Sequence, residues 1–135
     1  MPYIELAVWI GGWLHFATLT ASALVPFVLN WREQLSRVDP LVRQLFWVYG
    51  AFIVLSIVAF GWVSVTQADA LTQGTPLARI VCGFVAVFWG MRLAVQLFVF
   101  DARPYLKHWT LALGYHGLTV VFAYHVVVYS LAAAV

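Results

Sequence analysis

The sequence predicts an all-α membrane protein built as a bundle of four transmembrane helices. Its 135 residues are 64% hydrophobic and only 9% charged, and the mean hydropathy is +0.94. A soluble domain carries about a quarter of its residues as charged side chains, so lipid must cover most of this surface. A spanning helix takes about 20 apolar residues. The length therefore accommodates four such helices with short connections, in a single domain over residues 1–135.

Polar interruptions divide the sequence into four apolar stretches. Asp39 and Pro40 precede the second stretch, where the aspartate is expected to cap a helix and the proline to occupy its first turn. No basic segment and no small-residue cleavage site accompany the first stretch, which predicts a retained helix and not a removed signal peptide. The four predicted helices span residues of about 4–29, 42–65, 77–100 and 109–135.

Basic residues are distributed unevenly between the two ends of the predicted helices. The first and third loops lie at one end and contain five basic residues, whereas the opposite end has a single basic residue, Arg79. Because cytoplasmic loops are enriched in basic residues, both loops are predicted to be cytoplasmic and both termini to lie on the non-cytoplasmic side. The expected location is a bacterial inner (cytoplasmic) membrane. The basic residues of the two loops are Arg32, Arg37, Arg43, Arg103 and Lys107.

Small and polar residues at helical spacing are expected to mark the faces that point into the bundle, because membrane helices pack through such residues. In chain order, the four faces hold Gly11, His15, Thr18 and Ser22; Tyr49, Ile53, Ser56 and Phe60; Arg92 and Gln96; and Ala112, His116, Thr119 and Ala123. The bulkier face of the fourth helix is predicted to point outward, toward lipid or a partner, with Leu118, Phe122, His125 and Tyr129.

Helical rise places several inward polar residues at one depth. At about 1.5 Å per residue, Ser22, Tyr49, Arg92 and His116 lie about 10–14 Å from the cytoplasmic end. An ionised side chain inside a bilayer costs at least a few kcal/mol, which makes Arg92 a candidate functional residue. Alternatively, Arg92 extends to the cytoplasmic surface or pairs with a helix C-terminal carbonyl. We expect it to form a hydrogen bond with Tyr49, Gln96, His116 or Ser22.

Three histidines are candidate cofactor ligands, because neutral imidazole binds haem iron. His15 and His116 differ in depth by about seven residues, roughly 10 Å, so we expect no haem b between them within one chain. A haem shared with a neighbouring chain remains open through an outward-facing His125. The alternative for each histidine is a structural role, bonded to Thr18, Tyr49 or a backbone carbonyl.

A second class of ligand fits the same polar layer. Tyr49, Arg92, Gln96 and His116 supply donors for a quinone, a lipid headgroup or a small anion, and aromatic neighbours supply contact area. The alternative is a purely structural hydrogen-bond network. No Cys-x-x-Cys, His-Glu-x-x-His or glycine-rich phosphate motif is present, so neither a metal site nor a catalytic residue is predicted.

Three short segments carry a resemblance to known proteins: Gly12–Phe16, Trp47–Gly50 and Phe98–Asp101. They resemble small, uncharacterised bacterial four-helix membrane proteins of similar length, and the likeness covers most of the chain. It implies the four-helix fold and no particular activity. His15 alone gives a looser likeness to the small four-helix membrane proteins of copper resistance and of haem pathways, from which no function is carried over.

Two hypotheses about function follow from these observations. The first is an accessory or anchor subunit of a larger membrane complex that handles electrons, with a cofactor contact from His15, His116 or His125. The second is a self-contained carrier or small membrane enzyme that binds a quinone, lipid or haem-type ligand at the Arg92 layer. The expected partners are the lipid bilayer and other membrane subunits. The net charge of +2, with no basic stretch interleaved with aromatics, excludes nucleic acid.

Overall fold

The structure is a computed structural model that describes residues 2–99 and 107–135. These residues are helical apart from short connections, and no strand occurs among them. Within these ranges, four helical segments are long and apolar enough to cross a membrane, which confirms the expected all-α organisation. Phe100, Asp101 and Arg103, which belong to the third predicted helix and loop, lie outside the described residues. The four segments are Tyr3–Phe27, Pro40–Thr66, Pro76–Val99 and Trp109–Ala134.

The helix bounds follow local sequence signals. Asp39 caps the second long helix as expected, because its Oδ1 accepts a hydrogen bond of 2.9 Å from the backbone N–H of Leu41. Thr75 caps the third long helix in the same way, because its Oγ1 accepts a hydrogen bond of 3.2 Å from the backbone N–H of Ala78. Pro26 lacks an N–H, and the first predicted helix is interrupted just before it. The elements are α1 (Pro2–Ala23), α2 (Val25–Val28), α3 (Trp31–Leu35), α4 (Pro40–Thr66), α5 (Ala68–Leu71), α6 (Pro76–Ala94), the π-helical turn η1 (Val95–Val99) and α7 (Trp109–Ala134).

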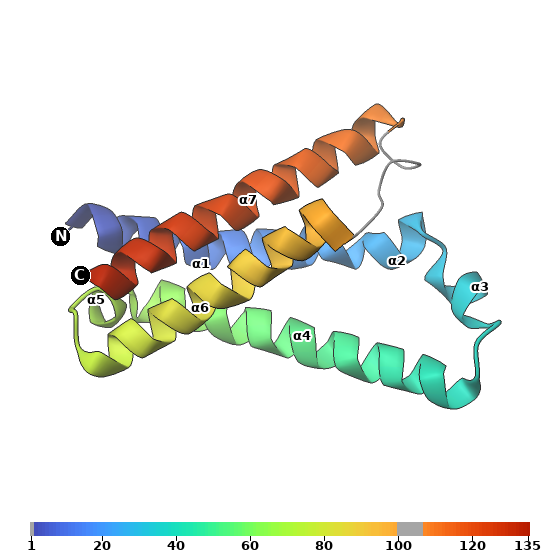
Figure 1. The fold of residues 1–135 in the computed structure, drawn as a ribbon, viewed down its shortest axis with the longest axis horizontal. Helices are drawn as coiled ribbons and strands as arrows, with labels where there is room; N and C mark the ends of the chain where they lie inside the picture. The colour runs from blue at the N-terminus through green and yellow to red at the C-terminus, as the bar shows by residue number, and fades with distance from the viewer. Residues whose placement is uncertain (1, 100–106) are drawn as a thin grey trace.

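The helices converge near the two termini and diverge toward the opposite end, near α3 (Figure 1). α6 packs along α7, α4 packs mainly against α1, and α1 also contacts α7. Residues 40–56 of α4 and 109–121 of α7 contain no buried residue. We call these two segments, together with α3, the open half of the molecule. The remainder, which holds the core, is the closed half.

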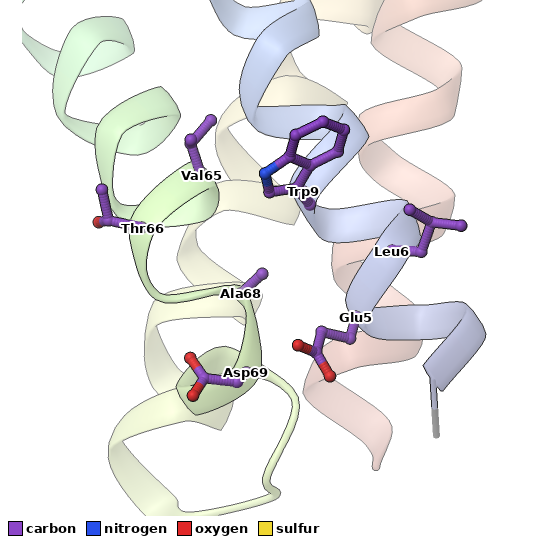
Figure 2. A pocket seen from close by; sticks show the side chains of 7 residues that line it. All are labelled: Glu5, Leu6, Trp9, Val65, Thr66, Ala68 and Asp69. Carbon is purple, nitrogen blue, oxygen red and sulfur yellow. The ribbon is translucent and has the colours of Figure 1, made fainter.

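A cavity of about 320 Å³ lies in the closed half, near the termini. Figure 2 shows that Glu5, Leu6 and Trp9 reach it from α1, and that the other side chains come from the end of α4 and from α5. Its carboxylates belong to Glu5 and Asp69, two exposed residues near the ends of spanning segments. The cavity therefore lies at the edge of the apolar region and not at its centre.

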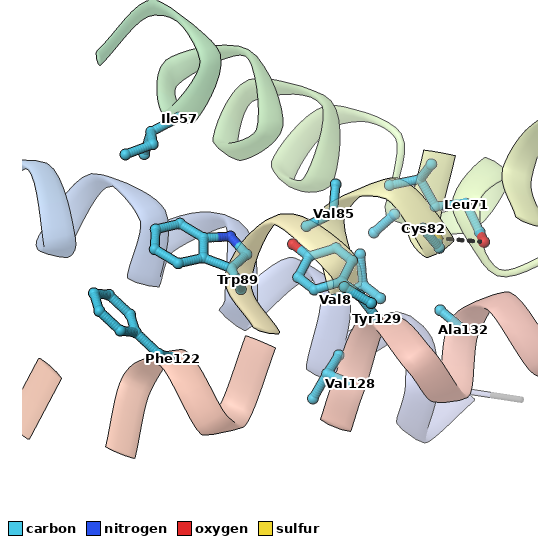
Figure 3. Packing of buried hydrophobic residues seen from close by; sticks show 12 residues of the cluster. Val8, Ile57, Leu71, Cys82, Val85, Trp89, Phe122, Val128, Tyr129 and Ala132 are labelled. Carbon is cyan, nitrogen blue, oxygen red and sulfur yellow. Dashed lines mark hydrogen bonds between the residues drawn. The ribbon is translucent and has the colours of Figure 1, made fainter. Parts of the chain in front are cut away.

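Large aromatic side chains fill the core of the closed half (Figure 3). Trp89 and Tyr129 are fully buried, and Phe122 is 2% exposed. The thiol of Cys82, the single cysteine of the sequence, is buried and donates a hydrogen bond of 3.5 Å to the carbonyl of Leu71. The interior is thus filled by rings that reach across the bundle from α6 and α7.

Two glycines bring the backbones of α1 and α4 into contact. A Cβ atom at Gly12 would lie 2.9 Å from the carbonyl oxygen of Gly61, and a Cβ at Gly61 would lie 3.1 Å from the carbonyl oxygen of Gly12. Small residues allow membrane helices to approach this closely. The Gly12–Gly61 crossing therefore fixes where α4 is held against the rest of the closed half.

The predicted inward faces are correct for the first and third helices and only partly correct for the second and fourth, where Phe60 packs against the core and Thr119 is bonded to Gln96. On α7, the expected inward His116 is exposed, and the expected outward residues Phe122, His125 and Tyr129 are buried. Small residues were expected to mark the interface, but aromatic rings fill this interior instead. On α4, the expected inward Tyr49 is exposed, and so is Ile53, because the helix packs further along, through Ile57, Gly61 and Ser64.

Candidate functional site

Two histidines from different helices meet in the middle of the closed half. His15 of α1 and His125 of α7 are both fully buried, and their ring centroids lie 4.2 Å apart. The indole of Trp89, from α6, is stacked on His125 at 4.9 Å and meets His15 edge-on at 5.2 Å. The prediction that His125 faces outward is wrong, because the face of α7 that carries it points inward, toward His15.

His15 has a hydrogen-bond partner at each ring nitrogen. Its Nδ1 lies 2.7 Å from the carbonyl oxygen of Gly11, and its Nε2 lies 2.8 Å from Nε1 of Trp89. An indole N–H can only donate, so Nε2 must be the acceptor and the proton must reside on Nδ1, which donates to Gly11. These two bonds fix the neutral tautomer and the orientation of the His15 ring.

A tyrosine and a serine extend this polar group to the fourth spanning helix. The hydroxyls of Tyr129 (α7) and Ser64 (α4) are hydrogen-bonded at 2.6 Å, and both residues are buried. The Tyr129 ring lies 5.8 Å from the His15 ring. Each of the four spanning helices therefore contributes a buried polar or aromatic side chain. We call this group the histidine cluster: His15, Ser64, Trp89, His125 and Tyr129.

Some buried polar atoms near the cluster have no hydrogen-bond partner. Among the described residues these atoms are Nδ1 and Nε2 of His125 and Nε of Arg92. Leaving a buried donor or acceptor unsatisfied costs about 1–3 kcal/mol, and more for a charged group. Such atoms in a folded protein call for an explanation, for example a water molecule, an ion or a ligand.

Arg92 lies against the aromatic rings next to the cluster. Its guanidinium carbon is 5.9 Å from the centroid of Phe122, which is within the range of a cation–π interaction, and the Phe122 ring is 4.9 Å from that of Trp89. The side chain is half-buried. Arg92 and His125 therefore flank the same pair of rings, Trp89 and Phe122.

The expected hydrogen bond from Arg92 to Tyr49, Gln96, His116 or Ser22 is wrong: none of these four described residues bonds to it. Gln96 is instead bonded to α7, where its Nε2 donates to Thr119 Oγ1 at 2.6 Å and to the Tyr115 carbonyl at 3.2 Å. The Tyr115 hydroxyl donates back to the Gln96 carbonyl at 3.0 Å. Gln96 lies in the π-helical turn η1, a feature that often occurs at functional sites.

The six predicted site residues divide into two groups. His15, Arg92 and His125 lie around Trp89 and Phe122, and Gln96 lies one turn beyond Arg92, in η1. Tyr49 is 62% exposed and His116 is exposed, and both lie in the open half. The sequence interpretation missed Ser64 and placed Tyr129 on the wrong face. A polar residue three positions after Gly61, within an apolar stretch, was the signal available for Ser64.

The arrangement of the histidine rings bears on the haem expectation. An iron between two imidazoles sets their centroids about 6 Å apart, given metal–nitrogen bonds of about 2.0 Å, and the rings of His15 and His125 are 4.2 Å apart. That a single chain binds no haem between two histidines stays a prediction. A haem shared through an outward His125 is contradicted, because His125 is fully buried.

Chemically, the site combines a neutral, fully bonded His15 with a guanidinium in an aromatic setting and with His125, which has no hydrogen-bond partner among the described residues. Within residues 2–99 and 107–135, no group of three or more histidine, cysteine, aspartate or glutamate side chains is placed to hold a metal ion. The site can therefore offer hydrogen-bond donors and aromatic surface to a ligand. Comparisons of the chain with protein-family models, with curated proteins and with solved structures find no match.

Proposed function

We propose that the chain is an accessory or anchor subunit of a larger membrane complex, and that transmembrane helices of a partner pack on its open half. The observation that carries this proposal is the exposure of α4. In the most apolar window of this helix only 17% is buried, against 28% in each of the other three spanning segments. A lipid-facing helix of a bundle normally packs along one side. None of residues 40–56 is buried.

Glycines in the open half support the same proposal. A Cβ atom at Gly50, Gly114 or Gly117 would meet nothing within 4 Å. A glycine inside a helix costs about 1 kcal/mol relative to alanine. Close packing of another helix against the small residue offsets that cost in membranes. Helices of a partner subunit would supply this packing, because a neighbouring helix can bring its backbone close to a glycine and a lipid chain cannot.

The orientation in the membrane forms part of the proposal. The open end carries Arg32, Arg37, Arg43 and Lys107, whereas the closed end has one basic residue, Arg79, and the acidic Glu5 and Asp69. The rings of Trp31, Phe46 and Trp47 also cluster at the open end, with centroids 4.9–6.0 Å apart, as in an interfacial aromatic belt. The open end is then cytoplasmic, and both termini lie on the other side of a bacterial inner membrane. That the complex handles electrons, with haem b or a quinone, stays a prediction.

Cysteine labelling tests the orientation. Ser36→Cys and Gln73→Cys place exposed thiols at opposite ends, and the native Cys82 is buried. In intact cells, a membrane-impermeant maleimide that reaches only the non-cytoplasmic side is expected to label Gln73→Cys and to spare Ser36→Cys until the cells are opened. Labelling of Ser36→Cys in intact cells would reverse the proposed orientation.

Native mass spectrometry of the gently solubilised protein tests the docking. We expect a defined assembly with other membrane polypeptides, at least tenfold depleted by Gly117→Leu because the larger side chain prevents close helix approach. Gly83→Leu is the matched control, since Gly83 also faces open space but lies in the closed half, on α6. A wild-type chain found only as a monomer or homodimer contradicts the proposal, and so does equal depletion by both variants.

A further inference from the structure

We propose that the partner helix that docks on the open half carries an aspartate or glutamate whose carboxylate pairs with Arg92. This inference rests on the docking proposed above and adds the chemistry of the partner, a transmembrane helix with an acidic side chain inside the apolar region. Two observations carry it. Arg92 has no counter-ion among the described residues, and it lies where α4 and α6 separate, beside the open half.

Arg92 is a charged side chain inside an apolar span. It lies seven residues before Val99, the end of its spanning segment, which is about 10 Å along the helix. Among the described residues the only ion pair is Arg37–Glu33, and the buried Nε of Arg92 has no hydrogen-bond partner. The ring of Phe122, 5.9 Å away, attracts the charge but does not neutralise it. Because charged residues inside membranes almost always pair with another group, we expect a counter-ion from outside the described part of the chain.

The contact between α4 and α6 indicates which side of α6 carries Arg92. The rings of Phe60 on α4 and Phe88 on α6 lie 5.2 Å apart. Arg92 follows Phe88 by four residues, so it lies on the same side of α6, one turn nearer the open half. The two helices run in opposite directions and diverge toward the open half (Figure 1). Arg92 therefore lies one turn beyond the contact, where the two helices separate.

The face of α4 that carries Phe60 continues into the open half. Ser56, Ile53 and Tyr49 precede Phe60 by four, seven and eleven residues, which is about one, two and three turns. Ser56 is half-buried, and Ile53 and Tyr49 are exposed. A partner helix that covers this face of α4 therefore passes beside Arg92.

A carboxylate fits this position better than a neutral acceptor. The guanidinium has five donors and no acceptor, and a carboxylate can accept two of its N–H groups side by side while neutralising the charge. A second copy of the chain does not offer a carboxylate at this depth, because each of its acidic residues lies outside a spanning segment or in its first turn. The partner is then a different polypeptide. The acidic residues of the chain are Glu5, Glu33, Asp39, Asp69 and Asp101.

Carbodiimide cross-linking in native membranes tests for the carboxylate. Arg92→Lys keeps the charge and places an amine at this position, and Lys107→Arg in the same chain removes the only native lysine. A membrane-permeant carbodiimide then joins the amine, through an amide bond, to a carboxylate in contact with it. We expect a covalent product with another membrane polypeptide, which mass spectrometry should map to an aspartate or glutamate inside a transmembrane helix.

Met91→Lys in the same Lys107→Arg background is the matched control. Met91 is 64% exposed at nearly the same depth, but it is rotated by about 100° around α6, so its product should be at least tenfold weaker. Equal yields from the two lysines overturn the proposal, and so does a product that joins Arg92→Lys only to its own chain, for example to Asp101. The absence of any product, which is the result expected if a lipid phosphate neutralises Arg92, overturns it as well.

Assembly measurements separate this inference from the docking on which it rests. In native mass spectrometry, Arg92→Gln should deplete the assembly at least tenfold, because the partner's carboxylate is left buried and unpaired. Arg79→Gln is the matched control: it removes an exposed arginine at the other end of α6 and should leave the assembly intact. If Arg92→Gln fails to fold, cross-linking of the folded Arg92→Lys variant decides.

The two ways of failing have different signatures. An assembly that forms in the wild type and is depleted by Gly117→Leu, but is retained in a folded Arg92→Gln variant, supports the docking and overturns the pairing with Arg92. A wild-type chain that forms no assembly with other membrane polypeptides overturns both.

Discussion

Adding one methyl group at Gly12 is expected to lower the free energy of unfolding by about 3 kcal/mol, the upper part of the range for overpacking. A Cβ at this position would lie 2.7 Å from Val65 Cγ2, 2.9 Å from Ser64 Cβ and 2.9 Å from the Gly61 carbonyl oxygen. Only the Val65 methyl can move away by side-chain rotation. Relief of the other two contacts requires α1 and α4 to separate. Because α4 packs mainly against α1, Gly12→Ala should release it from the closed half.

Thermal unfolding in detergent measures this effect. Gly83→Ala and Gly90→Ala are the matched controls, since a Cβ at Gly83 meets nothing within 4 Å and one at Gly90 meets only Val126, at 3.9 Å. Both controls should match or slightly exceed wild type, because alanine favours the helix. A Gly12→Ala variant as stable as these controls would mean that the two helices do not cross at this glycine.

The helix ends could be predicted from the sequence because their signals are local. The cap at Asp39 with Pro40, and the turn that ends at Thr75 and Pro76, are encoded within a few residues, and the structure shows both. The interruption before Pro26 also has a local cause, but the apolar stretch around it concealed the break. Arg92 could be singled out for a similar reason, because a charge within an apolar stretch stands out without knowledge of its neighbours.

The rotation of each helix could not be derived in the same way. The face of α7 that points inward depends on the side chains that α6 places in the interior. Trp89 of α6 fills the centre with a large ring, and the inward residues of α7 are Phe122, His125 and Tyr129. The contact between His15 and His125 depends on this rotation, so it was missed together with the face. The Gly12–Gly61 crossing likewise involves residues that are distant in sequence, and neither glycine alone indicates its partner.

The two buried histidines are expected to respond in opposite ways to substitution. His15→Ala removes a fully buried ring and leaves the Trp89 indole N–H without its acceptor. The loss of buried volume together with an unpaired donor should cost about 3–5 kcal/mol of unfolding free energy. His15→Phe fills most of that volume, so it isolates the hydrogen-bond contribution, about 1–3 kcal/mol. His15 is thus expected to be essential for the stability of the closed half.

For His125 the same substitution by phenylalanine should leave the stability of the ligand-free chain unchanged or raise it. No bond to a described residue is lost, two unpartnered nitrogens disappear, and an aromatic ring still stacks on Trp89. Thermal unfolding of His15→Phe and His125→Phe, delipidated and side by side, makes the comparison. If His125→Phe is destabilised as much as His15→Phe, then His125 has a structural partner within the chain. If only His15→Phe is destabilised, His125 retains two polar atoms that folding does not require, which is the pattern expected of a ligand-binding residue.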